Sequence, residues 1–270
     1  MATKMFLNLN SQYYRPKLCT LETYKQVRNF KKLRSNVKKN EINLSNAKIE
    51  QGQLHFSKLW KPFAFTVVFS GSTFLVAAIF EYERIRKHTY RIINRYKEYA
   101  INKTGWRRDF EVAWRNLSEG QRMFAPICFL NVIVFLAWRV PMLNQTMMKY
   151  FCTTPSSRVL CWPMLLSAFS HYSFLHLAAN MCVLHSFSHM AVQTLGKEQF
   201  VAFYLTSGVI SSFTSYLYKT MVGVCSPSLG ASGAIMGIIG LICTQYPETY
   251  LSIIFLPMYH FKAGTVRYIS

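Results

Sequence analysis

PSLGASGAIMGIIG, residues 227–240, places Ser232 where a glycine-containing loop meets an apolar segment long enough for a helix. Gly233 and Gly237 lie four residues apart, a spacing of small residues that lets a second helix approach closely inside a membrane. A serine at a helix start is often a cap for the first backbone N–H groups. Its hydroxyl can also act as a nucleophile when a neighbouring group accepts its proton. The stretch alone therefore leaves two interpretations of Ser232.

A second polar cluster, HYSFLHLAAN at 171–180, precedes this stretch by two apolar segments. His176 and Asn180 are four residues apart, so on a helix they share one face, and His171 lies just before that helix. An imidazole and a carboxamide side by side can donate hydrogen bonds to a developing oxyanion. The alternative is that both side chains tie neighbouring helices together. Because ionisable groups are expensive in a membrane, the cluster is a candidate functional site.

Apolar runs of membrane-spanning length surround these clusters. A span needs about 20 apolar residues, and backbone groups in lipid must be satisfied within each helix. The sequence therefore predicts an all-α polytopic membrane protein with a bundle of helices. The expected spans cover residues 62–80, 123–140, 172–192, 199–218 and 230–246, with a further apolar stretch at 250–261 that is half a span.

Charge divides the 270 residues into a basic front and an apolar back. The formal net charge is +20, from 31 Lys and Arg against 11 Asp and Glu. Most bases flank the apolar spans, where they meet lipid headgroups, and no zinc-finger spacing or RNA-binding motif is present, so we expect no nucleic-acid partner. The seven cysteines form no Cys-x-x-Cys pair, which argues against a disulfide framework. We expect no metal and no cofactor.

The predicted organisation has four parts. Residues 1–61 form a basic N-terminal region, which fits a mitochondrial presequence or a basic tail on the cytoplasmic side. Residues 62–80 form an extra transmembrane helix. Residues 81–122 form a charged amphipathic connector that carries Trp106 and Trp114 and lies at the membrane surface. Residues 123–270 form the core.

The order of these features resembles the rhomboid family of intramembrane serine proteases over residues 123–264. Trp162 precedes His171, His176 and Asn180 follow on one span, and the Gly230-Ala-Ser-Gly233 motif comes two spans later. The stretches CWPMLLS (161–167), SLGASGAIM (228–236) and IIFLPM (253–258) resemble the mitochondrial branch of that family. The resemblance implies a rhomboid-like helical bundle preceded by one extra helix, with the last core helices missing.

The resemblance also implies roles for the polar residues. Ser232 would be the nucleophile, and His176 and Asn180 would form the oxyanion hole with the Ser232 backbone N–H. His171 would brace the loop above the site, with Gly230, Gly233 and Trp162 supporting the motif. The catalytic base of the family, a histidine on the last core helix, has no counterpart in this chain. His185 and His189 lie too far along the His176 helix, and His260 lies near the end of the chain.

The expected function is that of an intramembrane serine endopeptidase, a multi-pass protein of the mitochondrial inner membrane. Its partners would be membrane lipid and the transmembrane helices of single-span substrates. The alternative is a catalytically inactive truncated isoform, or pseudoprotease, that binds such helices without cutting them. The missing base histidine is the sequence feature that favours this alternative.

Overall fold

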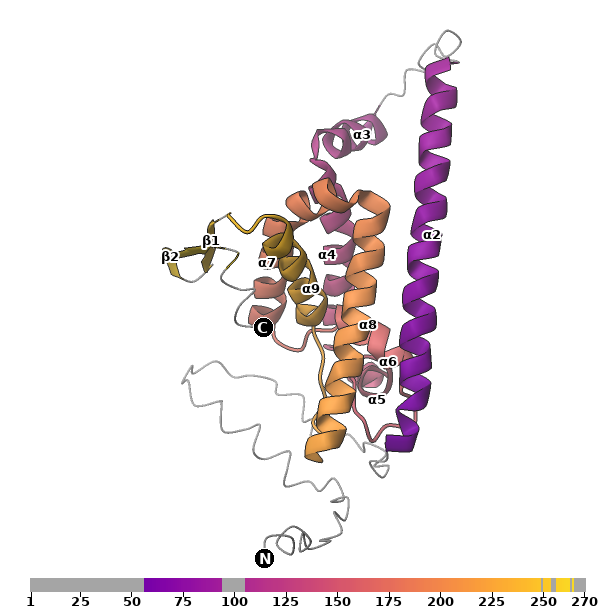
Figure 1. Cartoon of the computed structure of the whole chain (residues 1–270), viewed down its shortest axis with the longest axis vertical. Coiled ribbons are helices and arrows are strands. Elements are labelled where there is room, and N and C mark those ends of the chain that lie inside the picture. Colours follow the sequence, from indigo (N-terminus) through magenta and orange to yellow (C-terminus); the bar gives the residue numbers. More distant parts are fainter. Residues whose placement is uncertain (1–55, 94–104, 249, 254–255, 263, 265–270) are drawn as a thin grey trace, which may run out of the picture.

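The computed structural model describes residues 56–93, 105–248, 250–253, 256–262 and 264 of the chain (Figure 1). Most of the expected presequence at 1–61 lies outside the described residues. So does part of the expected connector, at 94–104.

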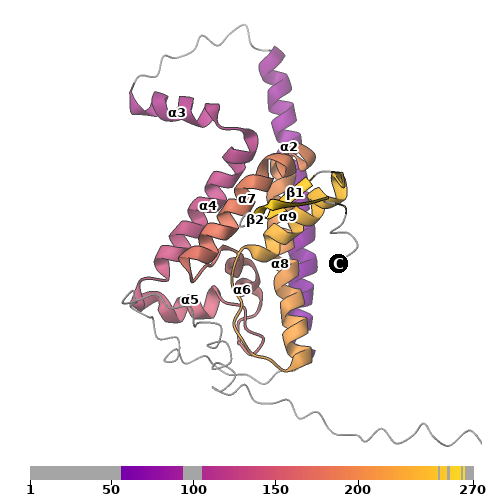
Figure 2. The ribbon, with the colours of Figure 1, turned by 90° about the vertical axis from the view of Figure 1, so that its left-hand side faces the viewer.

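A long helix and a crosswise helix begin the described chain. A short 3-10 helix, η3 (Phe56–Lys58), leads into α2 (Trp60–Ile93). α3 (Trp106–Asn116) lies crosswise to its neighbour α4 (Glu119–Ala137), which enters the bundle (Figure 2). Short elements then fold back at one end of the bundle: η4 (Pro141–Leu143), α5 (Asn144–Tyr150), α6 (Cys161–Leu166) and η5 (Ser167–Phe169).

Three further helices complete the bundle: α7 (Phe174–Leu195), α8 (Lys197–Val222) and α9 (Ser232–Gln245). α2 packs along α8, α8 along α9, and α4 along α7. The main core lies between α4, α7, α8 and α9. It is built of apolar side chains, among them Ile127, Leu184, Phe200, Ile235 and Ile238. This core holds the start of α7 against the start of α9.

Among the described residues, three helical stretches are long and apolar enough to cross a membrane: Phe56–Tyr90, Glu119–Ala137 and Lys197–Val222. α9 is apolar but shorter. α7 forms where a span was expected, yet its histidines and Asn180 make it more polar than these three. The helices follow the predicted spans because each apolar segment satisfies its own backbone groups.

α2 does not end where its apolar run ends. The predicted span at 62–80 is part of a longer helix, which continues without a break to Ile93, into the segment predicted as an amphipathic connector. At 1.5 Å per residue its 34 residues extend roughly 50 Å, well beyond the hydrocarbon thickness of about 30 Å. The charges that begin at Glu81 therefore end the apolar surface without ending the helix.

The expected half-span at 250–261 is wrong. The structure forms an antiparallel hairpin there, from β1 (Tyr250–Ile253) and β2 (Leu256–Lys262). Tyr250 pairs with Lys262, and the register shifts between Ser252 and Ile253. Pro257 within β2 lacks an N–H and would break a helix at this point, whereas the hairpin pairs its backbone groups locally. The all-α class holds for the bundle, and the hairpin is added to it.

Candidate active site

Ser232 is the first residue of α9 and not its cap. Ala231 occupies the N-cap position, and the Ser232 side chain is exposed. The positive end of the helix macrodipole therefore lies at the Ser232 hydroxyl, where it favours negative charge. The capping interpretation of Ser232 does not fit this arrangement.

His176 and Ser232 both lie beside Gly230. A Cβ atom on Gly230 would lie 2.8 Å from His176 Cε1, 3.2 Å from its Nε2 and 3.7 Å from Ser232 Oγ. Gly230 also has a φ of +131°, a conformation that side-chain-bearing residues rarely adopt. Glycine at this position lets the loop pass directly over the imidazole and bring the hydroxyl close to it.

Asn180 lies one turn beyond His176 on α7 and is buried. Its Nδ2 donates a 2.7 Å hydrogen bond to the His176 carbonyl oxygen. A carboxamide has two N–H donors, so one of them is not used by this bond. His176 and Asn180 share one face of α7, as their spacing predicted.

His171 connects the loop before α7 to the loop before α9. Its Nε2 accepts a 3.3 Å hydrogen bond from the backbone N–H of Ala231, and its ring meets the His176 ring edge-on with centroids 5.0 Å apart. Burial, with a smaller contribution from His176, lowers the pKa of His171 from 6.5 to about 4. The ring is therefore neutral at physiological pH, as an acceptor at Nε2 must be.

The loop that carries Ser232 is held by residues that sequence reasoning missed. Thr153 and Ser228 exchange two backbone hydrogen bonds, of 2.8 and 3.0 Å, and the Thr153 hydroxyl adds a third at 2.9 Å. The buried Lys219 donates from Nζ to the Ser228 hydroxyl at 2.5 Å. The Gly230 N–H donates to the Ser167 carbonyl at 2.9 Å. These contacts fix the loop immediately before Ser232 at several points.

A cavity of about 420 Å³ opens beside Ser232, between α8 and this loop. Hydroxyl groups provide much of its lining. Three of these hydroxyl groups belong to serines that lie close together on α8, between residues 211 and 215. This clustering of serines is visible in the sequence. The hydroxyl-bearing lining residues are Thr153, Ser167, Ser211, Ser212, Ser215, Ser228 and Ser232.

The remaining candidates take no direct part in the contact between these groups, and Gly233 is the one that lines the same cavity. Trp162 is on α6 with 60% of its surface exposed. Gly233 lies against the side chain of Ser211 on α8, which explains the small residue there. His185 packs edge-on against Phe124 of α4. Within the described part of the chain, no group of three or more histidine, cysteine or acidic side chains is arranged to hold a metal ion.

The fold and the site define a helical membrane protein in which a helix-start serine faces a His-x-x-x-Asn helix. Residues 159–269 match the Rhomboid domain, and the chain is a rhomboid-domain protein. It is 50% identical over 212 residues to the human protein named presenilin-associated rhomboid-like protein, mitochondrial, covering 76% of this chain and 56% of that protein.

Two further relatives agree with this assignment. The zebrafish (Danio rerio) presenilin-associated rhomboid-like protein A, mitochondrial, is 41% identical over 234 residues, 77% of this chain and 60% of that protein. Rhomboid protein 1, mitochondrial, of Saccharomyces cerevisiae is 31% identical over 131 residues, 48% of this chain and 38% of that protein. The chain thus spans about 56% of the length of the human relative. No solved structure matches the chain significantly.

Proposed function

We propose that the chain acts as an intramembrane serine endopeptidase of the rhomboid kind in the mitochondrial inner membrane, with several membrane spans. The observation that carries this proposal is that the Ser232 hydroxyl and the His176 imidazole both lie beside Gly230, at the start of α9. The names of the relatives support the mitochondrial location. The substrates would be single-span proteins whose helices reach the site from the surrounding lipid.

In this proposal Ser232 Oγ attacks the scissile carbonyl carbon, and its proton passes to a base. The rhomboid family carries that base as a histidine on its last core helix, a group without a counterpart among the described residues. The carbonyl oxygen becomes an oxyanion, which needs preorganised donors. The Ser232 backbone N–H at the start of α9, the His176 ring and the second N–H of Asn180 would supply them. The macrodipole of α9 adds stabilisation at the same position.

His171 would contribute by position and not as the base. Its Nε2 already accepts the Ala231 N–H, and the lowered pKa makes the ring a weak proton acceptor. It would hold the backbone next to Ser232 at the distance that the oxyanion donors require.

The same observation favours a second candidate, the binding of transmembrane helices without cleavage. Of the two imidazoles beside Ser232, His171 is engaged at Nε2 and His176 is assigned to the oxyanion. When a serine enzyme loses its base, only a small part of the catalytic rate remains, and the oxyanion hole and substrate binding supply it. The binding groove of such a protein would be the same as that of the enzyme.

Labelling of the purified full chain with a fluorophosphonate probe in lipid nanodiscs tests the two candidates. The endopeptidase predicts labelling that Ser232→Ala abolishes. Ser186→Ala is the matched control, because Ser186 is an exposed serine on α7 whose hydroxyl donates to its own helix at 2.9 Å. Absence of labelling, together with capture of a single-span helix that Gly230→Trp abolishes, would favour binding alone. If the chain neither reacts nor captures a helix, both candidates fail.

A further inference from the structure

α3 carries three aromatic side chains on one face, which we call the aromatic stripe: Trp106, Phe110 and Trp114. They are spaced four residues apart and therefore lie along one side of the helix. Their exposed fractions are 75%, 63% and 38%, and the rings of Phe110 and Trp114 stack with centroids 6.1 Å apart. Three large aromatic groups on one exposed helix face are an interaction surface.

The direction of α3 is fixed by its junction with α4. The Arg122 guanidinium donates to the Arg115 carbonyl at 2.6 Å and to the Leu117 carbonyl at 3.0 Å, which closes the C-terminal end of α3. Ser118 then caps α4 in a reciprocal pair of bonds with Gln121. These bonds hold α3 crosswise to the membrane-spanning α4 (Figure 2).

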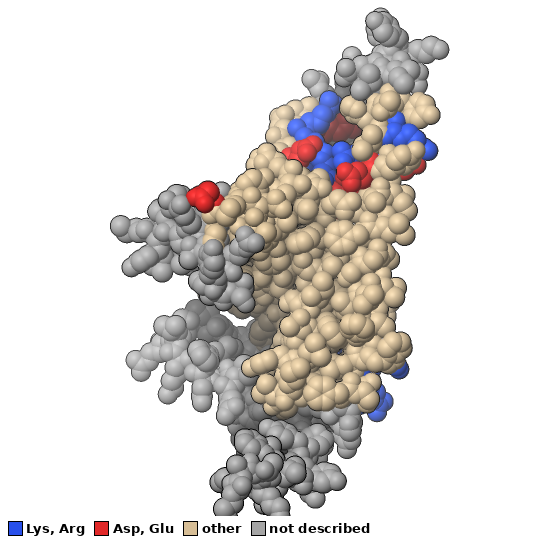
Figure 3. Space-filling view, viewed as in Figure 1, with Lys and Arg blue, Asp and Glu red and all other residues tan. Residues whose placement is uncertain are grey.

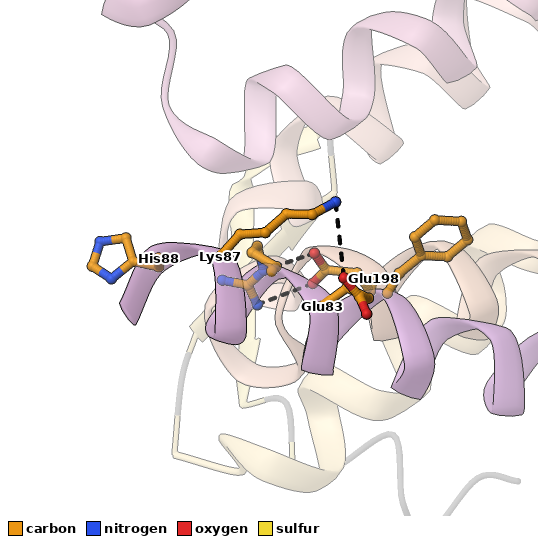
Figure 4. A pocket seen from close by; sticks show the side chains of 6 residues that line it. Glu83, Lys87, His88 and Glu198 are labelled. Carbon is orange, nitrogen blue, oxygen red and sulfur yellow. Dashed lines mark hydrogen bonds and ion pairs between the residues drawn. The ribbon is translucent and has the colours of Figure 1, made fainter. Parts of the chain in front are cut away.

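The junction lies in a layer of charges at the end of the apolar bundle. Glu119, the first residue of α4, pairs with Lys197 at 2.6 Å, and Arg84 pairs with Glu198 at 2.7 Å. Figure 3 shows charged side chains gathered at this end, above a broad face without charge. An open pocket of about 450 Å³ in the same layer is lined by Glu83, Lys87, His88 and Glu198 (Figure 4).

The uncharged surface of the bundle ends at this layer. Below it the exposed surface of α2 is apolar, as at Leu75 and Ile79, whereas beyond Glu81 charged side chains share the surface with exposed apolar ones such as Ile85. α7 runs from the site near His176 to Gly196 beside this layer. Gly233 lies against Ser211, near the middle of α8, so about half the length of α8 separates this layer from the Ser232 site.

We propose that α3 lies in the bilayer surface at the level of this charged layer, with the aromatic stripe inserted among the lipid headgroups. The partner is the lipid bilayer itself. Tryptophan is favoured at the membrane–water boundary, where its apolar ring and its N–H are both satisfied. The 11 residues of α3 are too few to cross a bilayer, and its sequence WRRDFEVAWRN alternates aromatic and charged groups as a surface helix does.

This contact sets the position of the bundle. Interfacial aromatic anchors determine the tilt and depth of a transmembrane helix. Because α3 is joined to α4 by the Arg122 bonds, anchoring α3 fixes the depth of α4 and of α7 packed against it. The depth of the Ser232 site, which lies between α7, α8 and α9, follows from the same anchor. The inference does not depend on whether Ser232 is catalytic.

Tryptophan fluorescence of the full chain in phosphatidylcholine vesicles tests the proposal. The emission spectrum of the double variant Trp106→Phe/Trp114→Phe is subtracted from that of the wild type. The difference spectrum then contains the emission of Trp106 and Trp114, the two tryptophans of the aromatic stripe. We expect this difference emission to be blue-shifted, quenched by lipids brominated on the acyl carbons nearest the headgroup, and protected from acrylamide. Quenching by acrylamide without quenching by brominated lipid would overturn the proposal. Insensitivity to both quenchers would also overturn it, since a second copy or a protein would then cover the stripe.

Two single variants separate the stripe from the rest of α3. Phe110→Asp places a charge in the stripe and should shift the tryptophan emission to the red, with loss of quenching by brominated lipid. Val112→Asp is the matched control, since Val112 is 46% exposed on α3 but lies on another face. If both variants behave alike, the effect is one of charge on α3 and the stripe is not the contact.

Discussion

Gly230 has no side chain at the point where the loop before α9 passes the imidazole of His176. In Gly230→Ala the new methyl group would lie 2.8 Å from His176 Cε1, and a φ of +131° would add strain of about 1–3 kcal/mol. We expect His176 to be displaced and any reaction of Ser232 with a fluorophosphonate to be lost. The measurement is labelling yield together with the melting temperature in detergent.

Gly223→Ala is the control for this prediction. Gly223 also has a positive φ, of +72°, but a Cβ atom there would meet nothing within 4 Å. It should lose about 1–2 kcal/mol of stability from backbone strain and keep its reactivity. Equal loss of labelling in both variants would show that strain, and not the contact with His176, is responsible.

His171 gives the site a pH dependence whose sign is fixed by its pKa. The pKa is about 4 in the folded chain and 6.5 ordinarily, so between these values the unfolded chain binds a proton that the folded chain does not. The contribution of His171 to stability is therefore complete above pH 6.5, falls as the pH is lowered, and is lost below about 4. We expect the melting temperature to fall between pH 7 and pH 5.

The variant His171→Asn isolates this contribution. Asparagine offers a neutral oxygen to the Ala231 N–H at every pH, so the part of the pH dependence that belongs to residue 171 should disappear. Carboxylates elsewhere titrate equally in both proteins and cancel in the comparison. Identical pH profiles would mean that His171 does not control the stability of this loop.

At the scale of elements, α4 and α7 touch through backbone at Gly120. A Cβ atom on Gly120 would lie 2.5 Å from His189 Cα and 2.7 Å from its N, and backbone cannot move aside as a flexible side chain can. Gly120→Ala should therefore separate the two helices at a cost of about 1–3 kcal/mol. Thermal unfolding in detergent measures the loss.

Gly71→Ala on α2 is the matched substitution without a neighbour. Nothing lies within 4 Å of its Cβ position, so the better helix propensity of alanine should leave stability unchanged or raise it by up to about 1 kcal/mol. The prediction fails if the two variants melt together. It would also fail if Gly120→Ala melted at the wild-type temperature.

The elements also show what sequence can and cannot predict. The spans were predicted because an apolar segment in lipid has few alternatives to a helix. The continuity of the span at 62–80 with the helix beyond Glu81 was not predicted, because charges end the apolar segment without ending the helix. The hairpin at Tyr250–Lys262 was missed because its apolar composition suits a strand as well as a helix.

In the candidate site, too, some contacts could be predicted from the sequence and others could not. The pairing of His176 with Asn180 follows from helical spacing, and sequence alone predicted it. The bond between Lys219 and Ser228 joins two segments across a loop, and that between Thr153 and Ser228 joins residues 75 apart in sequence. No local pattern contains such contacts, since they depend on how α5, α6 and α8 pack.

For the molecule as a whole, the extra helix α2 is held to the bundle at three levels. Phe63 packs on Phe213 at one end, the Thr73 and Thr206 hydroxyls lie 3.2 Å apart in the middle, and Arg84 pairs with Glu198 at the other end. The Arg84 guanidinium uses two nitrogens, at 2.7 and 3.0 Å from the two carboxylate oxygens. Such two-point pairs fix orientation as well as distance.

A charge swap tests whether this ion pair fixes α2 on α8. Arg84→Glu and Glu198→Arg should each lower the melting temperature in detergent, and the double variant should regain most of the loss. The arginine is about half exposed, so the coupling should be on the order of 0.2–1 kcal/mol and should weaken in high salt. Glu83→Arg is the control, because Glu83 pairs within α2 to Arg86 and should show no coupling to Glu198. The loss of stability in the double variant is compared with the sum of the losses in the two single variants. If the two are equal, the ion pair does not hold α2 on α8, and the contacts of Phe63 and Thr73 do.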